Sequence, residues 1–149
     1  MAAGSARRVT GFTLIELLVT LAVAFILATV AMPGLQRLIV SNRLASDYNE
    51  ILAGLHYARS EAVKRREAVQ AVLAQGEGGA WQLTVSVVDG PELRVRTARD
   101  DDISTGAIEV TFNSLGRRAA CAPDTCDVSI GGKEILVGPS GRIGKPFDA

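Results

Sequence analysis

Two cysteines are the first residues of this chain whose type and spacing could support chemistry. Cys121 and Cys126 enclose a short loop that contains Pro123 and Asp124. A metal site would need further ligands, but the chain has no other cysteine, and its single histidine, His56, lies far upstream. A disulfide across this loop would stabilise the fold by about 2 kcal/mol and requires an oxidising compartment such as the bacterial periplasm. We therefore predict a disulfide, with two free thiols as the alternative.

Other residue types that serve catalysis or metal binding lack the necessary pattern. Asp100–Asp102 are three adjacent acids, whereas a calcium loop alternates its ligands, so we interpret them as a solvated turn. His56 lies among helix-forming residues and is interpreted as a solvated helix residue. No glycine-rich phosphate-binding turn follows a predicted strand. The sequence therefore predicts no enzymatic activity, no cofactor and no metal site.

Glu16 is the single charge in an apolar run of 21 residues, Phe12–Met32, which contains no Gly or Pro. A helix of this length can cross a hydrocarbon core of about 30 Å. Arg7 and Arg8 precede the run, so the positive-inside rule places the N-terminus in the cytoplasm and the C-terminal part in the periplasm. A secretory signal peptide would have a shorter apolar region and a small-residue cleavage site. A plain signal anchor fits the length but does not explain Glu16, because a carboxylate near the centre of a membrane span costs about 2.5–3.5 kcal/mol.

The segment from Gly11 to Val23, GFTLIELLVTLAV, resembles the processing and assembly signature of type IV pilins and of the pseudopilins of type II secretion. The resemblance implies that a prepilin peptidase cleaves between Gly11 and Phe12 and methylates the new amine of Phe12. It also implies that Glu16 pairs with the N-terminal amine of a neighbouring subunit. This pairing is physically reasonable, because two opposite charges in an apolar environment offset each other's desolvation.

Helical periodicity continues beyond the apolar run. Pro33 and Gly34 predict a kink or local unwinding, because proline removes a backbone hydrogen bond and collides with the preceding turn. Apolar and small residues then recur at spacings of three and four up to the basic run that ends at Arg66. The residues of this stripe are Leu44, Tyr48, Ile51, Leu55, Ala58 and Ala62. The sequence thus divides into a leader (1–11), a transmembrane and assembly helix (12–32) and the amphipathic half of the same helix (33–66).

Residues 67–149 change to the period of two that is typical of strands. The turn Asp89-Gly90-Pro91 separates two alternating runs and predicts a β-hairpin. The predicted strands are Val69–Leu73, Trp81–Val87, 93–97, Ile108–Phe112, Asp127–Ile130 and 134–137. We therefore expect an α+β fold, in which a long N-terminal helix packs on an antiparallel sheet in the manner of a type IV pilin.

Three short segments of this distal part resemble the GspH/FimT branch of the pilins. They are Ala58–Arg65 (ARSEAVKR), Phe112–Arg117 (FNSLGR) and the dipeptide Gly141-Arg142. The resemblance implies a minor pilin or pseudopilin, which is a single-pass protein of the bacterial inner membrane that joins a filament. Its expected partners are other pilins through the N-terminal helix, the prepilin peptidase and the inner membrane.

DNA binding is the alternative function. Some FimT-like minor pilins resemble DNA receptors with a Gly-Arg-x-Arg motif near the C-terminus, from which Gly141–Lys145 departs. Five cations could still share a face and bind phosphate weakly in a salt-dependent manner. They are Arg117, Arg118, Lys133, Arg142 and Lys145. Solvated basic loops are the favoured interpretation, since 16 basic and 16 acidic residues leave the chain without a net field.

Overall fold

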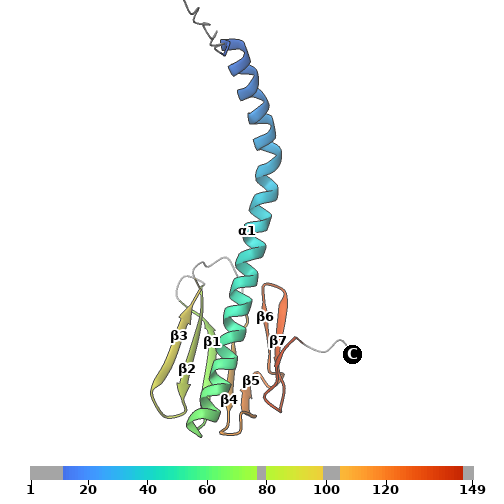
Figure 1. The fold of residues 1–149 in the computed structure, drawn as a ribbon. Coiled ribbons are helices and arrows are strands. Elements are labelled where there is room, and N and C mark those ends of the chain that lie inside the picture. Colours follow the sequence, from blue (N-terminus) through green and yellow to red (C-terminus); the bar gives the residue numbers. More distant parts are fainter. Residues whose placement is uncertain (1–11, 77–79, 99–104, 146–149) are drawn as a thin grey trace, which may run out of the picture. The chain divides into compact units, whose positions relative to one another are not determined.

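The computed structural model describes residues 12–76, 80–98 and 105–145, without the side chains of residues 30 and 33. In these residues one long helix, α1 (Leu14–Arg65), is followed by eight strands (Figure 1). This confirms the predicted α+β class. Contacts within the chain divide it into two compact units, Met1–Ser41 and Asn42–Ala149, so α1 contributes to both.

Local interactions fix both ends of α1. The Oγ1 of Thr13 accepts a hydrogen bond of 3.3 Å from the backbone N–H of Glu16, which is the usual arrangement at a helix N-cap. Lys64 and Arg65 lie in the last turn, where cations complement the helix dipole. Arg66 follows with a φ of 59°, the left-handed conformation that commonly ends a helix. The helix therefore ends within the basic run, as the sequence predicts.

The strands form two antiparallel sheets in the unit that begins at Asn42. The first sheet has the order β3-β2-β1-β4-β5, and the second has the order β6-β7-β8. The strands of the first sheet are β1 (Val69–Gln75), β2 (Trp81–Val87), β3 (Glu92–Thr97), β4 (Ile108–Phe112) and β5 (Arg118–Ala122). Those of the second are β6 (Asp127–Ile130), β7 (Lys133–Val137) and β8 (Ile143–Gly144). The predicted hairpin is confirmed, because β2 and β3 pair in antiparallel register.

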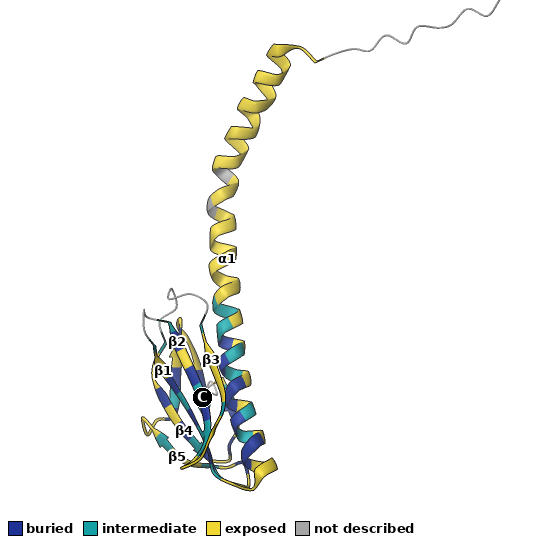
Figure 2. Ribbon diagram, turned by 90° about the vertical axis from the view of Figure 1, so that its left-hand side faces the viewer, coloured by how far each residue is buried: buried dark blue, intermediate teal, exposed yellow. Residues whose placement is uncertain are grey.

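The core of this unit lies between the sheets and the last part of α1 (Figure 2). The predicted helical stripe is buried from Tyr48 to Ala62, and Leu44 is half-buried at its beginning. On β2 the side chains of Trp81, Leu83 and Val85 are buried, whereas the intervening ones are half-buried or exposed. This alternation confirms that β2 has one face on the core.

A glycine sets the distance between α1 and the first sheet. Gly54 is buried in α1, and a Cβ atom at this position would overlap the Cδ2 atom of Leu83 on β2. Glycine normally weakens a helix interior by about 1 kcal/mol relative to alanine. Here the absence of a side chain allows the buried Leu83 to approach the helix axis closely.

Two strands were not predicted from the sequence. The strand β5 has the sequence RAACA, which is poor in β-branched and aromatic residues and shows no alternation of burial. It forms because its backbone pairs with β4, from Glu109↔Ala122 to Phe112↔Arg118. The strand β8 has two residues, too few for any periodic signal, and pairs with the end of β7.

Candidate functional site

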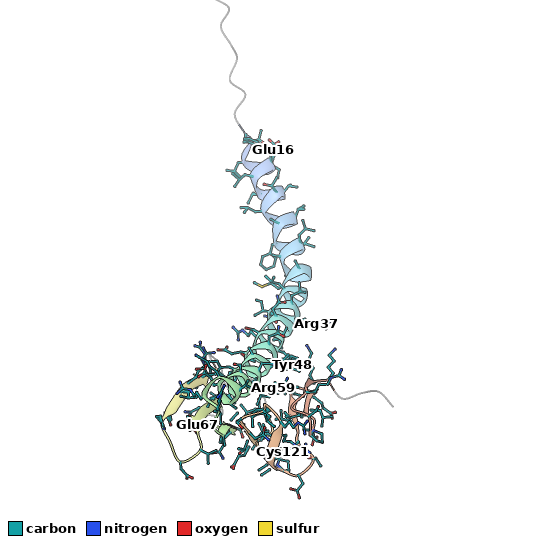
Figure 3. The ribbon with its side chains drawn as sticks, turned by 60° about the horizontal axis from the view of Figure 1, so that its bottom comes forward. Glu16, Arg37, Tyr48, Arg59, Glu67 and Cys121 are labelled. Carbon is teal, nitrogen blue, oxygen red and sulfur yellow. A yellow bond between two sulfur atoms is a disulfide. The ribbon has the colours of Figure 1, made fainter. Side chains whose placement is uncertain are left out.

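The first part of α1 contains the residues predicted to act in assembly. Phe12 precedes the helix, and Glu16 lies in its first turn (Figure 3). Gly11 lies outside the described residues, together with Arg7, Arg8 and the rest of the predicted leader. Of the residues predicted to act in processing and assembly, the structure therefore describes Phe12 and Glu16, which both lie on the C-terminal side of the predicted cleavage.

The surface of this stretch is apolar and uncovered within the chain. Every large apolar side chain described between Phe12 and Val40 is at least 44% exposed, and Phe25 reaches 73%. Apart from Glu16, Gln36 and Arg37, the described side chains therefore present a large apolar surface to their surroundings, which a soluble monomer rarely does.

Glu16 differs from the two threonines that follow it in this stretch. Thr20 and Thr29 donate their hydroxyl protons to the carbonyl oxygens of Leu17 and Ile26, at 2.9 and 2.7 Å, so each is satisfied within the helix. Among the described residues, none forms an ion pair or side-chain hydrogen bond with the Glu16 carboxylate. This carboxylate therefore has its charge available to a group from outside the described chain.

The helix is bent where proline predicts a kink. The backbone remains helical through Pro33. The parts Leu14–Thr29 and Gly34–Arg65 make an angle of 41°, and only as this bent pair do they have the length and hydropathy of a membrane span. Taken singly, no helix of the described residues meets that criterion. The bend coincides with the predicted kink.

Of the five predicted DNA-binding cations, two come together near the end of β7. The guanidinium of Arg118 donates a hydrogen bond of 2.7 Å to the carbonyl oxygen of Val137, the last residue of β7. The carbonyl of Arg142 accepts a hydrogen bond from the N–H of the next residue, Gly138. Arg118 thus bridges the two sheets, which is a structural role.

The two lysines lie at the other end of β7. Lys133 begins this strand, about 13 Å from its end at the usual rise per residue. Lys133 and Lys145 line a groove of about 560 Å³ together with Tyr48 and Glu134. The ammonium group of Lys133 lies 5.7 Å from the centre of the Tyr48 ring. Four of the five cations therefore lie in two groups toward opposite ends of β7, and DNA binding stays a prediction of the sequence.

The disulfide loop connects the two sheets. The structure joins Cys121 of β5 to Cys126, which directly precedes β6, with their Cα atoms 5.8 Å apart. Cys126 is fully buried, and the N–H of Val137 donates to its carbonyl oxygen at 2.9 Å. This position gives the predicted disulfide a clear structural role, which is to hold the edge of the first sheet against the second.

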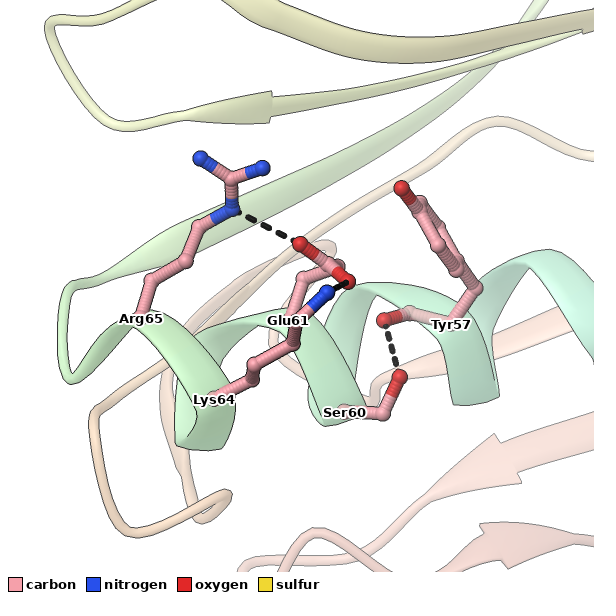
Figure 4. A network of polar contacts seen from close by, with 5 residues as sticks. All are labelled: Tyr57, Ser60, Glu61, Lys64 and Arg65. Atoms are coloured by element: carbon pink, nitrogen blue, oxygen red, sulfur yellow. Dashed lines mark hydrogen bonds and ion pairs between the residues drawn. The ribbon is translucent and has the colours of Figure 1, made fainter.

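Charged side chains near the end of α1 form a network of hydrogen bonds and ion pairs (Figure 4). Glu61 is 5% exposed and accepts hydrogen bonds from Arg65 at 2.7 Å and from Lys64 at 3.2 Å. The hydrogen bond from Arg65, and then that from Lys64, lowers the pKa of the Glu61 carboxyl. The same contact with Glu61 raises the pKa of Arg65. The basic run is therefore partly neutralised by an acid that the sequence places off the buried stripe.

The three GspH/FimT-like segments meet in one place. Arg59 of α1 donates a hydrogen bond of 3.0 Å from Nε to the carbonyl oxygen of Gly116. A Cβ atom at Gly141 would overlap that same carbonyl, so the two glycine turns are in direct contact. Both glycines have positive φ, 71° and 79°, which disfavours other residues. The sequence gives the three motifs separately, and their short lengths carry no signal that they pack together.

Metal ligands do not gather anywhere in the described residues, where no group of three or more His, Cys, Asp or Glu could hold an ion. The acids Asp100–Asp102 lie outside the described residues. His56 is exposed on α1, as predicted for a solvated helix residue.

Comparisons with known families match both parts of the chain. Residues 47–143 match the family model described as Type II transport protein GspH, and residues 6–32 match the Prokaryotic N-terminal methylation motif. No curated protein matches the chain.

Solved structures with a similar fold include two crystal structures of the type IV minor pilin FimU from Pseudomonas aeruginosa strain PAO1. The first is 24% identical, covers 71% of this chain and 90% of that one, and has a TM-score of 0.55. The second is 25% identical, covers 69% and 92%, and has a TM-score of 0.54. The long helix on an antiparallel sheet is thus the fold of a solved minor pilin.

Proposed function

Because this chain belongs to the GspH family of pilin-like proteins, we propose that it is a minor pilin or pseudopilin that joins a filament through α1. The filament is a type IV pilus or the pseudopilus of a type II secretion system. Before assembly, the chain crosses the bacterial inner membrane once, with the β-rich domain (67–149) in the periplasm. A prepilin peptidase cleaves between Gly11 and Phe12 and methylates the new N-terminus.

The observation that carries this proposal is the uncovered apolar stretch at the beginning of α1. Its described large apolar side chains are at least 44% exposed from Phe12 to Val40, whereas the described residues from Asn42 onward have a core of their own. Such a surface requires an apolar environment, since each buried Leu or Ile side chain gains about 1.5–3 kcal/mol. The membrane supplies that environment before assembly, and the helices of neighbouring subunits supply it afterwards.

Glu16 gives the assembled helices a register. Its carboxylate has no ion-pair partner among the described residues, and cleavage after Gly11 would create an ammonium group on Phe12. A carboxylate on one helix and an ammonium on the next attract strongly in an apolar surrounding. The pair can form at one relative height of the two helices, so it would fix the subunits in place as well as offset the cost of both charges.

The experiment is to prevent cleavage. Gly11→Ala should leave the full-length protein in the inner membrane and abolish its entry into filaments, as measured by immunoblotting of membranes and sheared filaments. Gly144→Ala is a matched control, because a Cβ at Gly144 meets nothing within 4 Å and the residue lies on β8, outside the apolar stretch and far along the chain from the proposed cleavage position. The control should be processed and assembled normally. Assembly of uncleaved Gly11→Ala protein would refute the proposal.

A further inference from the structure

The turn between β4 and β5 is fixed by its own hydrogen bonds. The Oδ1 atom of Asn113 accepts hydrogen bonds from the backbone N–H groups of Leu115 and Arg117, both at 3.0 Å. The carbonyl oxygen of Asn113 also accepts a hydrogen bond of 2.8 Å from the N–H of Gly116, and the N–H of Asn113 donates one of 2.9 Å to the carbonyl oxygen of Arg117. The conformation of this turn is therefore determined before any partner arrives.

The same turn is attached to α1. Arg59 donates to the carbonyl of Gly116, and a Cβ at Gly116 would lie 2.9 Å from the Cγ2 atom of Val63. Gly141, in the turn between β7 and β8, also contacts this carbonyl. Two other elements, α1 and the β7–β8 turn, thus hold the turn in position.

This ordered turn carries an exposed leucine. Leu115 is 73% exposed, and no other large apolar side chain described in residues 42–149 is exposed to that degree. Val63, which touches the turn, is 49% exposed and lines a groove of about 430 Å³ on α1. An exposed apolar side chain on a turn whose backbone is already fixed loses little backbone entropy on binding, which is a property of interface anchors.

The charges around Leu115 are positive. Arg117 follows it in the turn and is exposed. Arg59 and Lys64 line the groove beside Val63. Glu61 is the acid closest in sequence to the groove residues, but it is 5% exposed and bound to Lys64 and Arg65, so it contributes little outward negative charge. A complementary surface would be apolar at its centre and acidic at its rim.

We propose that these residues form a docking surface, the Leu115 surface (Leu115, Val63, Arg59, Lys64 and Arg117), for an acidic-rimmed apolar pocket on a neighbouring filament subunit. This inference rests on the proposed function, which supplies the neighbour. A protein is favoured over DNA because phosphate contacts require cations and gain nothing from an exposed leucine. The surface places a second contact between subunits on the periplasmic domain, separate from the contact through the N-terminal helix.

The test uses site-specific photo-crosslinking of the full-length protein in cells that make the filament. Leu115 is replaced by p-benzoylphenylalanine in one sample and Val95 in a second. Val95 is a matched control, since it is an apolar residue of the same unit, on β3, with 40% exposure. Phe25, which has the same 73% exposure as Leu115, is replaced in a third sample to report contacts of the N-terminal helix.

We expect position 115 to crosslink to another subunit that carries an N-terminal methylation motif. Mass spectrometry of the crosslinked product identifies that subunit. The yield should exceed that at position 95 by about fivefold or more, and Arg117→Glu should reduce it by a similar factor. Crosslinks at position 25 without an excess at position 115 over position 95 would overturn the Leu115 surface and leave the proposed function intact. Crosslinking of position 115 to DNA alone would also overturn it. An absence of subunit crosslinks at both positions 25 and 115 would overturn the surface and the proposed function together.

Discussion

The first part of α1, Leu14–Ser41, is much richer in apolar residues than the second, Asn42–Arg65, and the two parts have opposite relations to the rest of the chain. Between Asn42 and Arg65 the apolar side chains follow one stripe, and that stripe is buried against the two sheets. Between Leu14 and Ser41 they occur all around the helix and remain exposed. The helix is thus amphipathic where it packs on its own sheets and apolar on nearly all sides where no described residue covers it.

Substitution of one isoleucine in each part should separate these roles most strongly. Ile51 is fully buried, whereas Ile26 is 62% exposed. Ile51→Ala removes core contacts and should lower the free energy of unfolding of the periplasmic domain by about 2–5 kcal/mol. Ile26→Ala should leave it unchanged. The measurement is denaturant unfolding of the full-length protein in detergent, monitored by Trp81 fluorescence. Equal losses of unfolding free energy in the two variants would contradict the difference between the two parts of α1.

Reduction of the disulfide should lower the stability of the domain that contains the sheets and leave the N-terminal part of α1 unaffected. A short loop closed by Cys121 and Cys126 contributes about 2 kcal/mol, so a reductant or Cys121→Ala should destabilise the domain by about that amount. Membrane insertion of the N-terminal part should not change. Thermal unfolding with and without dithiothreitol measures the first effect, and alkylation of thiols in periplasmic protein checks the oxidation state. Reactive thiols without reductant would contradict the predicted disulfide.

The two glycines of α1 allow the effect of one substitution, glycine to alanine, to be compared between the two parts of the helix. Gly54→Ala would push a methyl group into the space of Leu83, which is itself buried and can move only by disturbing its neighbours. We expect a loss of about 1–3 kcal/mol in domain stability. Gly34→Ala meets open space and should leave the domain unaffected. A neutral Gly54→Ala variant in the same unfolding experiment would show that the helix and β2 are not in close contact.

The smallest effect should be the pH dependence that Glu61 contributes. Its pKa is lowered in the folded protein by Arg65 and Lys64, so the unfolded chain binds a proton more readily than the folded one. The stabilisation is therefore present above the unfolded pKa of about 4.3 and is lost as the pH falls through the lower folded value. Glu61→Gln should be less stable than the wild type at pH 7, and the difference should shrink below pH of about 4. A difference that grows on acidification would contradict the assigned network.

Sequence periodicity was sufficient for the parts of the fold that bury one face. The helical stripe from Tyr48 to Ala62 is confirmed, and β2, β4 and β6 have the predicted bounds. In each case a repeated apolar spacing corresponds to a repeated direction toward the core. The composition of β5 and the shortness of β8 left no such spacing to read.

The candidate site was predictable for a different reason and to a different extent. Glu16 is recognisable because one charge in 21 apolar residues is costly. The roles of Arg59, Gly116 and Gly141 could not be predicted, because they depend on contacts between segments far apart in the chain. Leu115 gave no signal either, since a single leucine in a turn has no periodic context and its exposure is a property of the folded turn.

The most direct test of the whole account is Glu16→Gln, which removes the charge and keeps nearly the same shape. Two quantities are measured on one sample, the unfolding midpoint of the periplasmic domain and the fraction of the protein recovered in sheared filaments. Since Glu16 has no ion-pair partner among the described residues, we expect normal membrane insertion, an unchanged midpoint and loss of the protein from filaments. Normal recovery of Glu16→Gln in filaments would contradict the central claim that this carboxylate joins one subunit to the next.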